Sequence, residues 1–191
     1  MKTHRIYWII TITIFIGLLV PTLVQDGMFL DGVTYSAISK NMSNGHGDFW
    51  NPHYTQTMYV NFYEHPSMVF IIQSFCFRIL GDGLYTERIF CLLTAILTAL
   101  GIVLCWRLFN NKNESGNYAW IPIILWITIP LVSWSFMNNL LENTLGVFTI
   151  FSVYFILKSL IKSKIKYLLL GSIFLVMAFL SKGLVGLFPF I

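Results

Sequence analysis

The residues best suited to chemistry gather in one polar segment, residues 25–66, near the start of an otherwise apolar chain. This segment holds four of the eight carboxylates and three of the four histidines in the sequence. Carboxylates and histidines together can transfer protons, bind charged groups or hold a metal. They are Asp26, Asp31, Asp48, Glu64, His46, His53 and His65. The segment is therefore the first candidate for a reaction site.

A metal centre is the less favoured interpretation of this segment. His46, Asp48, His53 and Glu64 have no recognised metal-ligand spacing. The three cysteines lie inside apolar stretches without a spacing motif, which indicates packing residues rather than a zinc site or a disulfide framework. The sequence does not identify a cofactor, and a divalent metal held by Glu64 with a histidine of the segment stays open as an alternative.

The rest of the chain must hold this segment at a membrane. Hydrophobic residues make up 57% of the sequence and charged residues 10%, with a mean hydropathy of +0.73. A soluble domain is about 45–50% apolar and about 25% charged. We therefore predict an all-α integral membrane protein. The formal charge of +4 does not indicate nucleic-acid binding, because the basic residues flank apolar segments.

Five apolar segments are predicted to cross the membrane. The basic start MKTHR and the apolar run after it together resemble a signal peptide. The apolar run continues through Pro21 without a small-residue cleavage site, which predicts a retained membrane anchor. Pro122 and Pro130 are expected to kink the third span. The chain stops within an apolar run, so we expect residues 1–191 to be the N-terminal part of a larger transmembrane domain. The predicted spans are 6–24, 89–106, 118–134, 143–157 and 167–180.

The loop between the first two spans, residues 25–88, opens with a predicted surface helix over 32–44. Asp31 stands directly before it, where an aspartate commonly caps a helix by accepting a backbone N–H. The alternative is that this carboxylate acts as a base, and the residue types alone leave both roles open. Spacings of three and four predict one apolar stripe on the helix, made of Tyr35, Ile38 and Met42.

A second apolar run, 67–80, is too short to be predicted as a span. At about 1.5 Å per residue it reaches about 21 Å, whereas the hydrocarbon core of a bilayer is about 30 Å thick. We expect it to lie along the membrane surface as a second interfacial helix.

The distribution of charges favours this count of five spans. It places eight of the twelve basic residues on the cytoplasmic side, as the positive-inside rule requires, and leaves seven of the eight carboxylates outside. If 67–80 crossed the membrane, the lysine cluster at 158–166 would move outside. The same count brings to the outer face Asp31, Glu64, His65, Glu87, Arg88, Glu142 and Lys182.

Five stretches in register along the chain carry a family resemblance. LDGVTYSAISKNM resembles the D-E-x-x-Y-x-x-I-x-x-x-M stretch of the lipid A aminoarabinose transferases and their relatives in glycosyltransferase family 39, which includes the protein O-mannosyltransferases. FYEHPSM resembles their E-K-P-P-L or H-P-P-L element, and YTERIFCLLTAILTALGIVLCWRLF their arginine-led span. LLENTLGVF is similar to D-M-P-L-T-x-F, and AFLSKGLVGLFPF to L-T-K-G-P-V-G-L. Order and approximate spacing hold over residues 6–191.

The resemblance implies a glycosyltransferase of GT-C type. Such an enzyme takes a sugar from a polyprenyl-phosphate donor and transfers it, with inversion, to a lipid, glycan or protein acceptor. The site is expected at the outer face of the membrane, here the periplasmic face of a bacterial inner membrane.

The resemblance also implies roles for individual residues. Asp31 matches the family aspartate and is expected to be the catalytic base. Contacts to the donor phosphate are expected from Lys182, His65 and Arg88. Contacts to the sugar or acceptor are expected from Glu64, Glu142 and Tyr35. Each role has a structural alternative. Lys182 could only extend its ammonium to the membrane surface, Glu64 and His65 could only begin the next helix, and Arg88 could pair with a nearby carboxylate.

The chain departs from the family pattern in four places. Gly32 stands where the family has a second acid, His65 where it has a lysine and Ser67 where it has a second proline. Glu142 replaces an aspartate. These changes bear on the phosphate contact and the sugar specificity more than on the class of reaction.

Two alternatives to an active enzyme are a non-enzymatic transport or scaffold protein and a catalytically inactive fragment. A transporter is expected to keep ionisable residues near the middle of its spans, at the interface of a repeat. Here the ionisable residues gather at one face and no internal repeat is visible, which disfavours a transporter.

Overall fold

The computed structural model describes residues 2–83, 85–110 and 118–190, which are helical apart from loops and two isolated β-bridges. By length and composition, four long helices can cross a membrane. A bent helix pair supplies a fifth candidate span, so the prediction of an all-α membrane protein with about five spans is confirmed. The four helices are α1 (Lys2–Leu23), α4 (Thr86–Phe109), α7 (Leu141–Lys162) and α8 (Ile165–Lys182).

The bent pair occupies the place of the predicted third span. Helices α5 (Trp120–Ile127) and α6 (Pro130–Met137) meet at an angle of 71°. The break falls at Pro130, which begins α6 and cannot donate the hydrogen bond that would continue α5. Pro122 lies in the first turn of α5, where a missing N–H breaks no helical bond. The prediction that Pro122 also kinks this span is therefore wrong.

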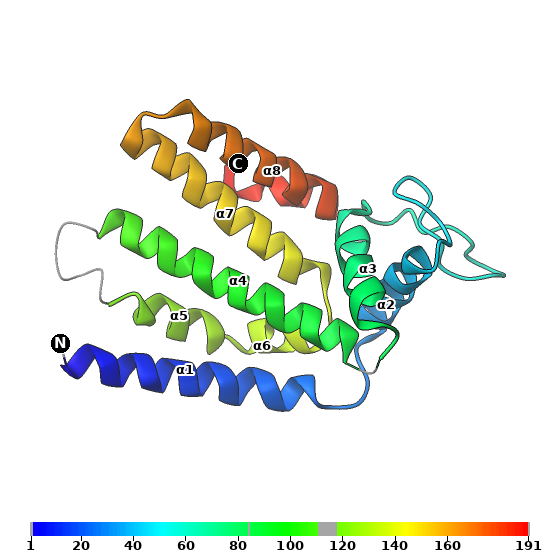
Figure 1. The fold of residues 1–191 in the computed structure, drawn as a ribbon, viewed down its shortest axis with the longest axis horizontal. Coiled ribbons are helices and arrows are strands. Elements are labelled where there is room, and N and C mark those ends of the chain that lie inside the picture. Colours follow the sequence, from blue (N-terminus) through cyan, green and yellow to red (C-terminus); the bar gives the residue numbers. More distant parts are fainter. Residues whose placement is uncertain (1, 84, 111–117, 191) are drawn as a thin grey trace.

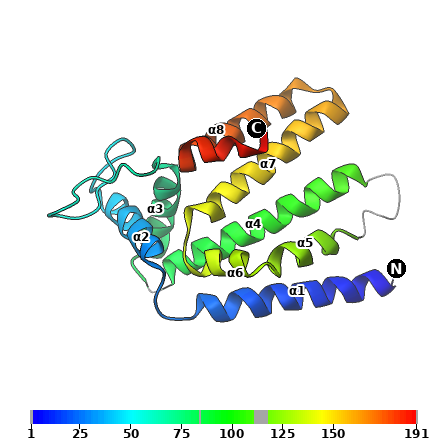
Figure 2. The same cartoon turned by 180° about the vertical axis from the view of Figure 1, so that it is seen from behind.

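The long helices form one bundle, and the two short outer helices lie together at one end of it (Figures 1 and 2). Helices α7 and α8 pack as an antiparallel pair, α4 lies beside α7, and α1 lies beside α5 and α6. Helices α2 (Leu30–Ser43) and α3 (Met68–Leu80) pack against each other at the end opposite the N-terminus. At 13 residues, α3 is about 20 Å long. This length is short of the hydrocarbon core of a bilayer, and the interfacial placement of α3 stays a prediction.

The apolar stripe predicted for α2 forms a small core beneath the outer loop. Tyr35, Ile38 and Met42 are buried and cluster with Phe70 of α3 and Leu141 of α7. Burying a large apolar side chain contributes about 1.5–3 kcal/mol. This cluster therefore fixes α2 against both α3 and the start of α7.

The segment between α2 and α3 contains a hairpin-like arm, residues 52–62. The backbone N–H of Tyr54 donates to the carbonyl of Val60 at 2.9 Å. The side-chain amide of Asn41, on α2, donates to the carbonyls of His53 and Tyr54. These bonds fasten the arm to the outer surface of α2.

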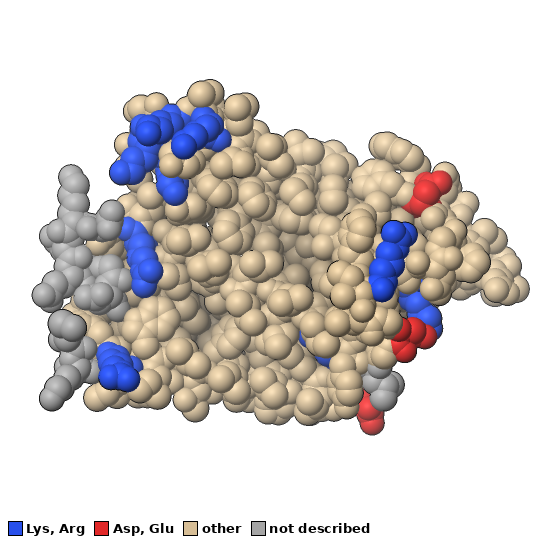
Figure 3. All heavy atoms as spheres, in the orientation of Figure 1, with Lys and Arg blue, Asp and Glu red and all other residues tan. Residues whose placement is uncertain are grey.

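Charged side chains separate toward the two ends of the bundle. In Figure 3, basic side chains gather at the end that carries the N-terminus and the turn between α7 and α8. The acidic side chains visible on this face all lie at the other end, near α2 and α3, with some basic side chains beside them. On this face the acidic side chains are therefore confined to one end of the bundle, here called the acidic end, whereas basic side chains lie at both ends.

Candidate functional site

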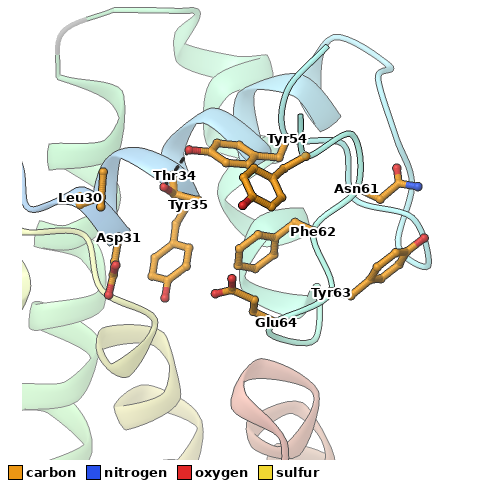
Figure 4. Close-up of a pocket in the computed structure, with 10 residues that line it drawn as sticks. Leu30, Asp31, Thr34, Tyr35, Tyr54, Asn61, Phe62, Tyr63 and Glu64 are labelled. Atoms are coloured by element: carbon orange, nitrogen blue, oxygen red, sulfur yellow. Dashed lines mark hydrogen bonds between the residues drawn. The ribbon is translucent and has the colours of Figure 1, made fainter. Parts of the chain in front are cut away.

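A cavity of about 510 Å³ opens between the start of α2 and the arm. Figure 4 shows Asp31 and Tyr35 reaching from α2 into the same space as Glu64, which follows the arm. Tyr54 and Phe62 of the arm line the cavity with aromatic surface. Three residues for which the sequence predicts catalytic or sugar-contacting roles thus lie together.

Tyr35 lies among carboxylates that come from three separate segments. Burial, together with the negative charges of Asp31, Glu142 and Glu64, raises the pKa of Tyr35 to about 12. Its hydroxyl therefore stays protonated at neutral pH and can donate a hydrogen bond to a carboxylate or a bound oxygen. The start of α2, the residues before α3 and the start of α7 therefore each place a carboxylate close enough to act electrostatically on this hydroxyl.

His65 belongs to the same neighbourhood, with its ring centroid 6.1 Å from that of Tyr35. Burial, and next the positive charge of Lys182, lowers the pKa of His65 below its ordinary value of 6.5, although the surrounding acids oppose this. The imidazole is therefore neutral at pH 7. A neutral imidazole can donate one N–H to a phosphate, but it adds no positive charge.

Lys182 ends α8 and forms an ion pair with Glu142, in the first turn of α7. The chain then turns at Gly183, which has a φ of +63°. A Cβ at Gly186 would lie 2.4 Å from the carbonyl oxygen of Ala178, so this glycine makes room for backbone of α8 rather than for a ligand. A lysine has three N–H donors, so Lys182 can hold Glu142 and still donate to a second anion.

Arg88 is buried at the start of α4, with 5% of its surface exposed. Its guanidinium donates to the carbonyls of Gln25, at 3.0 Å, and of Gly27, both in the loop after α1. It also donates to the carbonyl of Met137, at the end of α6. These contacts tie three segments together and favour a structural role for Arg88 over the phosphate contact expected from the sequence.

Arg88→Met is expected to lower the free energy of unfolding by about 3 kcal/mol, because it removes the hydrogen bonds that the buried guanidinium donates to three backbone carbonyls. Thermal unfolding of the detergent-solubilised protein measures the loss. The matched control is Arg107→Met, an exposed arginine at the other end of α4, which should change stability by less than about 0.5 kcal/mol. Equal losses in the two variants would contradict the structural role of Arg88.

Two buried asparagines that the sequence did not point to hold the start of α2. The side-chain oxygen of Asn138 accepts the backbone N–H of Phe29, the residue before α2, at 2.6 Å. The side-chain oxygen of Asn139 accepts a hydrogen bond from Gln73 of α3 at 3.0 Å, and its amide donates to the carbonyl of Gly32. The turn between α6 and α7 thus sets the position of the helix that carries Asp31.

Asp31 does not cap α2, which is the structural alternative to its expected role as a base. Helix α2 begins at Leu30, so Asp31 lies inside its first turn, and no side chain of the residue before the helix caps it. Within the described ranges, no hydrogen bond or ion pair engages the Asp31 carboxylate. It is therefore available to a ligand in the cavity.

The departure at Gly32 has a steric cause. A Cβ at this position would lie 1.9 Å from the carbonyl oxygen of Asn138. Because that atom belongs to the backbone, it cannot move aside as a flexible side chain would. An acid at position 32, as in the family motif, does not fit this packing.

Asp48, His46 and His53, the other possible metal ligands of the outer loop, do not line the cavity. Asp48 accepts the backbone N–H groups of Asn51 and Trp50, and these bonds lower the pKa of Asp48. The rings of His46 and His53 are 6.3 Å apart. Among the residues that the structure describes, no group of three or more His, Cys, Asp or Glu is placed to hold a metal ion.

Comparison with known families and proteins gives one assignment. The sequence model of the dolichyl-phosphate-mannose-protein mannosyltransferase family matches residues 64–191, which is more than half of the chain. The matched stretch includes Glu64, His65, Glu142 and Lys182. Comparisons with curated proteins and with solved structures gave no match. The chain therefore belongs to the dolichyl-phosphate-mannose-protein mannosyltransferase family.

Proposed function

We propose that the protein transfers a sugar from a polyprenyl-phosphate carrier to an acceptor hydroxyl at the outer face of the membrane. The observation that carries this proposal is the cavity that Asp31, Tyr35 and Glu64 line together, with the Glu142–Lys182 pair close enough to act electrostatically on Tyr35 and His65. These groups come from four separate segments of the chain. Membership of a family named for a lipid-phosphate mannose donor supports the same reaction.

In the proposed reaction Asp31 is the general base. Its carboxylate takes the proton of the acceptor hydroxyl, and the oxygen attacks the anomeric carbon of the donor sugar. The new glycosidic bond forms as the bond from that carbon to the phosphate oxygen breaks, which inverts the anomeric centre. The lipid phosphate leaves with the bonding electrons, and because it is a weak base it needs a positive charge nearby more than a proton.

Lys182 is the proposed partner of the leaving phosphate. Its ammonium already holds Glu142 and keeps donors for a phosphate oxygen. Neutral His65 can add one N–H to the same phosphate. Tyr35, as a protonated donor among the acids, is proposed to orient Glu64 or a sugar oxygen, and Glu142 to keep the lysine in place.

The proposed active face is the periplasmic side of a bacterial inner membrane. The lysines around the turn between α7 and α8 are Lys158, Lys162, Lys164 and Lys166, at the end of the bundle away from α2 and α3. Basic residues favour the cytoplasmic side. The acidic end with its cavity would then face outward.

The placement of charges along the long helices supports an enzyme rather than a transporter. In α4 the charged residues are Glu87 and Arg88 at the start and Arg107 near the end. In α8 they are Lys166 in the first turn and Lys182 at the end. A transporter is expected to keep such groups near the middle of the membrane.

Lys182→Met is expected to lower kcat/KM for the lipid-linked donor by about 10–100-fold, because a charge-assisted hydrogen bond contributes about 1.5–3 kcal/mol. The measurement is transfer of radiolabelled sugar from polyprenyl-phosphate donors by the protein in proteoliposomes. The control is Lys162→Met, an exposed lysine at the far end of α7, which should keep wild-type activity. Unchanged kinetics in Lys182→Met would remove this lysine from the reaction, and a wild-type protein that transfers no sugar would overturn the proposed function.

A further inference from the structure

The cavity beside Asp31 carries an uncompensated negative charge. Asp31 and Glu64 both line it, and none of its described lining residues is a lysine or arginine. Within the described part of the chain, neither carboxylate is held by an ion pair or a hydrogen bond. Both charges are therefore directed at whatever occupies the cavity.

The basic side chains at this end of the bundle are engaged elsewhere. Lys182 pairs with Glu142, and Lys40 pairs with Asp82 on the outer surface. Arg78 donates to a backbone carbonyl of α2 at 3.4 Å. The donor phosphate is proposed to bind Lys182, which does not line this cavity. A phosphate inside the cavity would meet two carboxylates and, among the described lining residues, no lysine or arginine.

The other lining residues offer fixed aromatic surfaces and neutral hydrogen-bonding groups. The hydroxyls of Tyr54 and Thr34 are hydrogen-bonded to each other at 3.1 Å (Figure 4), which holds the tyrosine ring against α2. The hydroxyl of Tyr63 donates to the side chain of Asn51 at 3.0 Å. Tyr59 lies at the tip of the arm with 66% of its surface exposed. Aromatic surface beside carboxylates suits a ligand with apolar C–H faces and many hydroxyl donors.

We propose that this cavity binds the acceptor, and that the acceptor is a neutral saccharide with one hydroxyl directed at Asp31. This inference rests on the proposed function and specifies the second substrate of the same site. A volume of about 510 Å³ lies in the usual range for small-molecule sites, about 300–1,000 Å³. A phosphorylated acceptor is disfavoured by the two like charges in a partly desolvated site. A peptide acceptor is the competing class, and the experiment includes it.

The experiment measures binding and transfer separately, with the protein in nanodiscs. The probes are methyl glycosides of neutral gluco-, manno- and galacto-configured disaccharides, the 6-phosphate of each, and an acetylated Ala-Ser-Ala amide. Without donor, saturation-transfer NMR is expected to detect at least one neutral disaccharide, with its phosphate bound at least about tenfold more weakly. Failure of every neutral disaccharide to bind, or preferential binding of a phosphate or of the peptide, overturns the inference.

Two variants assign the binding to this cavity. Tyr59→Ala should weaken disaccharide binding by about tenfold, because it removes one aromatic contact surface. Asn61→Lys places a cation in the lining and should strengthen binding of the phosphorylated probe by about tenfold. Its control, Asn44→Lys, adds the same charge on the exposed turn after α2 and should leave both affinities unchanged. If Asn44→Lys matches Asn61→Lys, the probes bind outside the cavity and the inference fails.

Adding the lipid-linked donors then tests the reaction itself. Transfer to the disaccharide that binds supports both proposals. A disaccharide that binds in the cavity but never receives sugar overturns the proposed function and leaves the neutral-saccharide site in place. Transfer to the peptide or to a phosphorylated sugar, with none to the neutral disaccharides, supports the proposed function and overturns the inference.

Discussion

Asp31→Asn is expected to reduce the rate of sugar transfer by about 10³-fold, because a positioned general base contributes about 10²–10⁴-fold. Asparagine has nearly the same shape as aspartate but cannot take the acceptor proton at neutral pH. The Asp31 side chain lines the cavity and has no hydrogen bond or ion pair within the described ranges. The substitution should therefore leave membrane insertion and the thermal unfolding temperature unchanged.

The matched control for Asp31→Asn is Asp26→Asn. Asp26 is exposed in the loop after α1 and lies outside the cavity lining. Initial rates at saturating donor and acceptor measure the effect, since they report the chemical step when it limits turnover. Wild-type activity in Asp31→Asn would exclude Asp31 as the base, and a comparable loss in Asp26→Asn would point to a general effect on the loop.

Gly32→Ala is expected to reduce the free energy of unfolding by about 3 kcal/mol and transfer activity by at least about tenfold. The added Cβ would lie 1.9 Å from the carbonyl oxygen of Asn138, inside van der Waals contact with a backbone atom. Forced overpacking of this kind costs about 1–3 kcal/mol, and more when the neighbour cannot yield. The start of α2 must move away from the turn at Asn138, and Asp31 moves with it.

Gly17→Ala is the control for the packing effect. Gly17 lies inside α1, and a Cβ there meets no atom within 4 Å. Alanine favours a helix over glycine by up to about 1 kcal/mol, so this variant should be as stable as the wild type or slightly more so. Thermal unfolding and transfer rates of the two variants are compared. A Gly32→Ala protein that is as stable and active as wild type would contradict the packing described here.

Local sequence features were enough to predict most of the helices. The stripe of Tyr35, Ile38 and Met42 identifies the buried face of α2 because helical periodicity is a local property. The length of the run at 67–80 predicts a helix too short to span, and α3 has 13 residues. The sorting of lysines against acids separates the two ends of the bundle without any knowledge of contacts.

The contacts that position the site could not be read from local patterns. Asn138 and Asn139 are 2% and 4% exposed and bond to residues more than 60 positions away in sequence. Only their presence next to an apolar run, just before Glu142, hinted at a buried polar role. Arg88 donates hydrogen bonds to three backbone carbonyls that come together only in the folded protein. The spacing of residues along the sequence does not indicate these bonds.

The role of Asp31 shows how small errors in helix boundaries change an interpretation. A helix starting at residue 32 would make Asp31 its cap, whereas α2 starts at Leu30, so Asp31 lies in the first turn, and its side chain lines the cavity. Helix ends are uncertain by one or two residues in any sequence-based estimate. For Asp31, a difference of two residues in the start of the helix decides whether its carboxylate is interpreted as a helix cap or as a group available to a ligand.

The central claim is that Asp31, Glu64, Glu142 and Lys182 serve one site on the outer face of the membrane. It is tested most directly with a membrane-impermeant maleimide on intact cells, in a variant whose three cysteines are replaced by alanine. Asn44→Cys, in the exposed turn after α2, is expected to be labelled, and Ser163→Cys, in the exposed turn between α7 and α8, is not. Labelling of both positions, or of Ser163→Cys alone, would contradict the proposed topology and with it the shared outer site.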